Sequence, residues 1–101
     1  MMGTMNQVAV ERVDAIHHYE LRRGTEVLGF TNYRDDGQWR VFINTEVSAE
    51  LADALIVGAL SDVKASGKRI VSLCPTITEW VMTNKQFENF VDGPPVLEKG
   101  R

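Results

Sequence analysis

The sequence contains little that would support a secreted, disulfide-bonded or membrane-spanning protein. It has one cysteine among 101 residues, so no disulfide can form within the chain, and we expect a cytoplasmic location. No apolar run approaches the roughly 18 residues that cross a bilayer. The first five residues also lack the basic and apolar regions of a signal peptide. We therefore predict no membrane partner.

The chain also has no excess of positive charge. Its 11 Lys and Arg residues are outnumbered by 14 Asp and Glu residues, which gives a net charge of −3. Nucleic acids and anionic membranes both require a basic face on their protein partners. The charge balance therefore argues against either as the main partner.

Length and composition predict a single domain with a core of its own. Apolar residues make up 44% of the chain, an ordinary value for a globular protein, and 101 residues are too few for two domains. We place the domain at residues 8–92. We expect flexible segments at 1–7 and at 93–101, where Gly93-Pro94-Pro95 begins a polar tail.

The first half of the chain has the alternating pattern of an antiparallel sheet. Short strands are predicted around Val8 and Tyr19, and a β-branched and aromatic strand over residues 27–33. Asp35-Asp36-Gly37 predicts the turn of a hairpin. In the long strand that follows, the period of two assigns one face to Trp39, Val41, Ile43, Thr45 and Val47, and the other face to Arg40, Phe42, Asn44 and Glu46.

The pattern changes to a helical period after residue 48. Apolar residues recur at three- to five-residue steps from Leu51 to Val63, with Ser48 as the N-cap and Gly67 as the end of the helix. A short buried strand over 70–73 follows. Because only about 20 residues separate it from the preceding strand, the two strands are predicted to be parallel. A capping box from Thr76 to Glu79 predicts a second helix.

The order of these segments resembles the small single-domain GNAT-type N-acetyltransferases, in the subgroup named for a cysteine and a glycine. The resemblance is carried by Tyr19-Glu20-Leu21, Gly29-Phe30, Thr45-Glu46-Val47, Gly67 and Leu73-Cys74-Pro75. It implies an α+β fold of GNAT type. In that fold an antiparallel meander continues into a mixed sheet with a βαβ crossover, and helices pack on the sheet.

The resemblance also implies a cofactor site. Acetyl-CoA would lie between two splayed strands, with its pantetheine arm hydrogen-bonded to the backbone of Thr45, Glu46 and Val47. The family's diphosphate sits on a glycine-rich turn that opens the long helix. This chain lacks that turn, and the segment from Ser48 to Asp53 contains two carboxylates instead. We therefore expect acetyl-CoA binding to be weak or absent.

Cys74 and Glu46 are the candidate catalytic residues. Cys74 follows a parallel strand and precedes a helix, so it is either a reactive thiol or a small buried residue. Glu46 is either a general base at the mouth of the cleft or a solvated carboxylate. His17 and His18 are adjacent and would point to opposite faces of a strand, so we expect no metal site.

These observations favour a degenerate relative of the acetyltransferases. We expect a non-catalytic or weakly acyl-CoA-binding interaction module, which acts as a homodimer or with another protein partner because sheet edges tend to pair. One alternative is an active acetyl-CoA-dependent N-acetyltransferase of small size that acts on an amine. Another is a general small-ligand pocket between the splayed strands.

Overall fold

The computed structural model describes residues 7–93 of the chain. The terminal segments that the sequence predicts to be flexible, 1–7 and 93–101, therefore lie almost entirely outside the described residues. The strands are β1 (Ala9–Val13), β2 (His18–Arg23), β3 (Glu26–Asp36), β4 (Trp39–Val47), β5 (Arg69–Ser72) and β6 (Val91–Asp92). The helices are α1 (Ala49–Ala65) and α2 (Pro75–Thr83), with short 3-10 helices η2 (Asp14–Ile16) and η3 (Lys85–Phe90).

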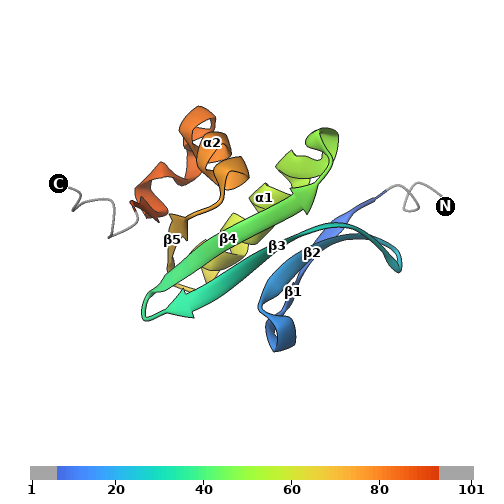
Figure 1. The fold of residues 1–101 in the computed structure, drawn as a ribbon, viewed down its shortest axis with the longest axis horizontal. Helices are drawn as coiled ribbons and strands as arrows, with labels where there is room; N and C mark the ends of the chain where they lie inside the picture. Colours follow the sequence, from blue (N-terminus) through green and yellow to red (C-terminus); the bar gives the residue numbers. More distant parts are fainter. Residues whose placement is uncertain (1–6, 94–101) are drawn as a thin grey trace.

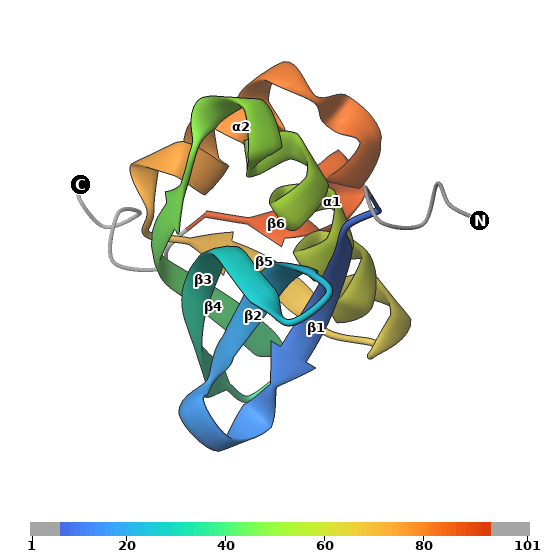
Figure 2. The same ribbon diagram turned by 90° about the vertical axis from the view of Figure 1, so that its right-hand side faces the viewer.

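The strands form one mixed sheet in the order β1-β2-β3-β4-β5-β6 (Figure 1). The first four are antiparallel neighbours, whereas β5 is parallel to β4 and β6 is parallel to β5 (Figure 2). The predicted meander and the predicted parallel crossover are both confirmed. Strand β6 was not predicted, because two residues are too few to show a period.

Helix α1 covers one face of the sheet and lies behind β4 in Figure 1. The side chains of Leu55, Ile56, Ala59, Leu60 and Val63 are fully buried, as their spacing predicts. Each such large apolar side chain contributes roughly 1.5–3 kcal/mol when buried. At Gly58 a Cβ atom would lie 2.4 Å from the Val10 side chain, so a glycine lets the helix approach β1 closely.

The predicted end of α1 is confirmed. Gly67 adopts a left-handed backbone conformation with a φ of 76°. The backbone N–H of Lys68 donates to the Val63 carbonyl, and that of Gly67 donates to the Lys64 carbonyl. This pair of hydrogen bonds is the Schellman motif, which satisfies carbonyl groups that the helix end would leave unpaired.

A β-bulge in β4 makes part of the predicted face assignment wrong. Asn44 pairs with Asn32 and Phe42 pairs with Tyr33, so Ile43 is an extra residue without a partner on β3. The bulge resets the alternation. Phe42 and Thr45 therefore point to the same face, towards α1, and Ile43 is left 41% exposed. The period of two does not hold across an extra residue, so the sequence pattern assigned Phe42 and Thr45 to opposite faces.

The predicted capping box of the second helix is also wrong. Cys74 is the N-cap of α2, and Pro75 occupies the first turn. Proline is favoured there because it has no N–H group to leave unsatisfied. The helix thus begins before Thr76, and Cys74 stands directly at its N-terminus, where its carbonyl accepts the backbone N–H of Thr78 at 3.0 Å.

A buried arginine organises polar contacts at the start of β4. Arg40 is 4% exposed, and its guanidinium group binds both carboxylate oxygens of Asp35 at 2.7 and 3.0 Å. It also donates to the Tyr19 hydroxyl at 2.8 Å and lies 4.4 Å from the centre of the Tyr33 ring. The hydrogen bonds from Arg40 lower the pKa of Asp35.

Both tyrosines in this cluster donate to carboxylates. The hydroxyl of Tyr19 donates to Asp62 and that of Tyr33 donates to Asp14, at 2.7 and 2.8 Å. Burial, followed by these hydrogen bonds, raises the pKa of both tyrosines, and that of Tyr33 rises to about 12. An unfolded tyrosine titrates near pH 10. The cluster therefore stabilises the fold only while the tyrosines stay protonated.

This difference in pKa predicts a loss of stability at alkaline pH. The contribution of Tyr33 is complete below about pH 10 and disappears as the pH rises to about 12, at a cost of about 1–2 kcal/mol. Tyr33→Phe should flatten this decline while lowering stability at neutral pH through the lost hydrogen bond. Urea unfolding at a series of pH values measures both effects. Parallel pH profiles for the two proteins would contradict the assignment.

Candidate functional site

The pairing between strands β4 and β5 ends halfway along β4. Their pairing runs from Trp39–Arg69 to Phe42–Ser72, and one further backbone bond joins the Leu73 N–H to the Phe42 carbonyl at 2.8 Å. Beyond this point β4 continues to Val47, whereas the other chain segment turns into α2. Figure 1 shows α2 beyond the end of β5. The predicted splayed strands are therefore present. We call the opening between residues 43–47 of β4 and the segment that follows β5 the fork.

The segment that the family resemblance assigns to the pantetheine arm forms one side of this fork. Thr45, Glu46 and Val47 pair with β3 through Thr31, Phe30 and Gly29. In the described residues, the pairing of β4 with β5 does not reach them. Their backbone on that side is thus outside the strand pairing and faces the fork. Cofactor binding by this backbone remains a prediction.

A chain of short polar contacts closes the bottom of the fork. The Cys74 thiol donates to the Thr45 hydroxyl at 3.2 Å, and this hydroxyl lies 2.9 Å from that of Thr31. The Thr31 hydroxyl also donates to the Asn44 carbonyl at 3.2 Å. Cys74 is 2% exposed and Thr31 is fully buried. These contacts tie the end of β5 to β3 across β4.

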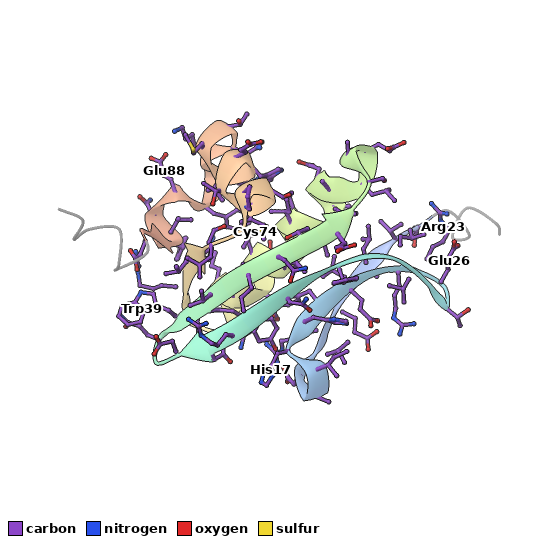
Figure 3. All side chains as sticks on the ribbon, in the orientation of Figure 1. His17, Arg23, Glu26, Trp39, Cys74 and Glu88 are labelled. Carbon is purple, nitrogen blue, oxygen red and sulfur yellow. The ribbon has the colours of Figure 1, made fainter. Side chains whose placement is uncertain are left out.

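The two candidate catalytic residues do not come together. Cys74 lies between β4 and α2 in Figure 3, and its thiol points towards the hydroxyl of the half-buried Thr45. Glu46 follows Thr45 directly, so its side chain points to the opposite face of the sheet, where it is exposed. In the described residues the thiol therefore has no basic side chain bound to it. This environment fits a small buried residue better than an activated nucleophile.

The entrance to α1 is short and acidic. Ser48 alone separates the end of β4 from the start of α1, and it is the N-cap, as predicted. Its carbonyl accepts the Leu51 N–H at 3.1 Å, while Glu50 and Asp53 are exposed around the first turns. A connection of one residue cannot form a loop that wraps a diphosphate with several backbone N–H groups.

A hydrogen bond joins the two helices beside this entrance. The indole N–H of Trp80 donates to Asp53 at 2.8 Å. The groove between the helices has a volume of about 300 Å³ and is lined by Ala52, Ile56, Thr76, Glu79, Trp80, Thr83 and Asn84. Among the described residues that line it there is one carboxylate, Glu79, and no lysine or arginine. The sequence offered no signal for this contact, because 27 residues separate the two partners.

The histidines do not form a metal centre. His18 binds Glu20 at 2.8 Å and stacks on Phe30, whereas His17 adopts a left-handed conformation beside Tyr33. Among residues 7–93 no three His, Cys, Asp or Glu side chains are grouped to hold a metal ion. Within the same residues, no helix is long and apolar enough to cross a membrane.

Comparison with known proteins assigns the family. Residues 18–90, which include the fork and both helices, match the family described as GCN5-related N-acetyl-transferase. The chain belongs to the GCN5-related N-acetyl-transferase family. The match confirms the predicted resemblance and extends over most of the described domain.

A solved structure confirms the fold. The NMR solution structure of a GCN5-like putative N-acetyltransferase from Staphylococcus aureus superimposes on this chain with a TM-score of 0.68 at 13% identity. The likeness covers 92% of this chain and 93% of the other. The predicted α+β architecture of GNAT type is therefore confirmed. No curated protein sequence matches this chain significantly.

The burial of Cys74 predicts that its thiol reacts slowly with thiol reagents. Because the residue is 2% exposed and its sulfur is bonded to Thr45, labelling requires a local opening of the fork. We expect a thiol reagent such as an aromatic disulfide to react at least about a hundredfold more slowly with the native protein than with the unfolded chain. Fast labelling of the folded protein at neutral pH would show instead that the thiol is accessible.

Proposed function

We propose that this chain is a GNAT domain with a degenerate acetyl-CoA site, which acts as a non-catalytic interaction module or binds acyl-CoA only weakly. The single-residue connection between β4 and α1 is the observation that carries the proposal. Diphosphate binding at a helix N-terminus depends on several backbone N–H groups that converge on the anion. A connection that consists of Ser48 alone is too short to arrange several backbone N–H groups around a diphosphate.

The charges around the entrance support the same conclusion. The N-terminus of a helix carries a partial positive charge that favours an anion. Glu50 and Asp53 lie within the first turns of α1, so their carboxylates already occupy this favourable field. Repulsion between a carboxylate and a nearby diphosphate is on the order of 1 kcal/mol or more near a surface.

Only one end of the cofactor fits the residues present. The fork offers the backbone of Thr45, Glu46 and Val47 to a pantetheine arm, which needs hydrogen-bonding groups and no charge. The diphosphate end would meet Glu50, Asp53 and the acidic groove instead. We therefore assign no acetyl-transfer step to this chain.

The second candidate function is an active N-acetyltransferase that acts on an amine. It is favoured by the fork itself, which places Cys74 near its base and Glu46 near its mouth. In this function Glu46 would accept a proton from the amine, or Cys74 would carry the acyl group. The bond from the Cys74 thiol to Thr45 and the separation of the two side chains count against it.

A comparison of two ligands separates these functions. Acetyl-CoA and S-acetylpantetheine share the acyl and pantetheine parts, and only the first carries the diphosphate. We expect both at millimolar concentration to raise the melting temperature equally, by no more than about 2–3 °C, as expected for a ligand near its dissociation constant. Differential scanning fluorimetry measures this.

The enzyme function predicts a different result for the same pair. Acetyl-CoA at a hundred times its dissociation constant would add about 2.7 kcal/mol to the stability, which raises the melting temperature by about 10–20 °C. A shift of that size for acetyl-CoA, with a much smaller one for S-acetylpantetheine, would contradict the proposal.

Removing the negative charges at the entrance should partly restore binding. Glu50→Gln with Asp53→Asn keeps the side-chain sizes, and the amide oxygen introduced at position 53 can still accept the Trp80 N–H. We expect acetyl-CoA affinity to rise about three- to tenfold at low salt, less at high salt, and S-acetylpantetheine affinity to stay constant. Isothermal titration of both ligands checks this. An equal change for the two ligands would exclude an electrostatic cause.

A further inference from the structure

One face of the sheet carries no helix in the described residues. In Figure 1, α1 lies behind β4 and no helix lies in front of β2, β3 or β4. Val41 and Val71 pair with each other on this face, opposite in direction to Arg40, Phe42 and Ile70. We call it the helix-free face.

The middle of this face carries an exposed apolar pair. Ile43 is 41% exposed because the bulge turns it out of the strand alternation, and Leu73 is 49% exposed just beyond the end of β5. The two lie close together, since the Leu73 N–H binds the carbonyl of Phe42. Val41 and Val71 on the same face are only 5% and 3% exposed, so Ile43 and Leu73 are the apolar side chains that this part of the face exposes. Exposed apolar side chains are a common feature of protein interfaces.

A hollow lies further along the same strands. It has a volume of about 400 Å³, and its lining includes Phe30 and Glu46, whose side chains lie on the helix-free face. The face thus has an apolar protrusion on one side of the Asn32–Asn44 hydrogen bond and a hollow on the other.

Two opposite charges also lie on opposite sides of the Asn32–Asn44 pair, one beside the protrusion and one beside the hollow. Arg34 pairs with Val41 beside the protrusion, whereas Glu46 pairs with Phe30 beside the hollow. Both side chains are exposed, and neither forms an ion pair within residues 7–93. Other charges on this face are paired, as in Glu20 with Arg22. Arg34 and Glu46 are therefore available to a partner with the reverse arrangement.

We infer that the helix-free face is an isologous dimer interface occupied by a second copy of this chain. A twofold axis that crosses the strands at Asn32 and Asn44 stacks the two sheets with their β4 strands antiparallel. It brings Ile43 and Leu73 over the hollow of the second copy, and Arg34 towards its Glu46, twice in each dimer. Both shape and charge are self-complementary only in this antiparallel arrangement.

This inference rests on the face and is independent of the proposed function. The sequence suggested a homodimer through sheet edges, but the edge strands of the described sheet are β1 and the two-residue β6. Such short edges offer little backbone for pairing. The dimer would also cover Glu46, so a substrate could not reach that carboxylate from the helix-free face.

Sedimentation equilibrium over a concentration series tests the interface. We expect the wild-type chain to dimerise, and Arg34→Glu or Glu46→Arg to raise the dimer dissociation constant at least about tenfold, because each change acts twice. The combined exchange Arg34→Glu with Glu46→Arg should restore the affinity to within about threefold of wild type. Leu73→Asp should leave a folded monomer.

Matched controls lie elsewhere on the surface. Arg23 and Glu26 are exposed at the far end of the β2–β3 hairpin in Figure 3, and Met82 is 67% exposed on α2. Arg23→Glu, Glu26→Arg and Met82→Asp should leave the dissociation constant unchanged. A wild-type chain that stays monomeric at millimolar concentration would overturn the inference. A dimer whose dissociation constant is unchanged by Leu73→Asp would overturn it as well. So would a double exchange that fails to restore the affinity.

Discussion

The pairing between β4 and β5 is the constraint on which the rest of the structure depends. It lasts for four residue pairs and stops where the bulge at Ile43 changes the course of β4. The bulge opens the fork, and it also returns Thr45 to the face that packs towards α1. From there Thr45 can meet both Thr31 and Cys74. One extra residue in a strand thus opens the fork and determines which side chains lie beneath it.

The stability of this arrangement comes from two different sources. Around α1 an apolar core is fully buried, and its members include Leu55, Leu60, Phe42 and Ile70. At the other end of β4 the buried charge of Arg40 is balanced by Asp35 and by the Tyr19 hydroxyl. A buried guanidinium group is tolerable only when its donors are bound in this way. The polar cluster therefore fixes the start of β4, and the core fixes its remainder.

Much of the fold could be predicted from the sequence, because its signals are local. The apolar spacing predicted α1, and Gly67 predicted its end. The short stretch of sequence between β4 and β5 predicted that these strands are parallel. The bulge could not be predicted, since an extra residue leaves the alternating pattern intact on either side of Ile43. The start of α2 was misplaced because a capping-box pattern from Thr76 competed with the proline at the true first turn.

The candidate site was only partly predictable for a related reason. The short acidic entrance could be recognised from residues 48–53 alone, since what matters is the number of residues present. The bond between Trp80 and Asp53, and the chain of contacts from Cys74 to Thr31, join segments that are far apart in the sequence. No local pattern marks such pairs. The opposed directions of Cys74 and Glu46 followed only from the folded strands.

The central claim is that this domain keeps the fork but has no cradle for a diphosphate. Phosphorus NMR of coenzyme A mixed with the protein tests it most directly, because the signal comes from the phosphates themselves. We predict that the diphosphate resonances keep the line width and position of the free cofactor even at high protein concentration. Broadened or shifted diphosphate resonances that sharpen when excess acetyl-CoA is added would contradict the claim.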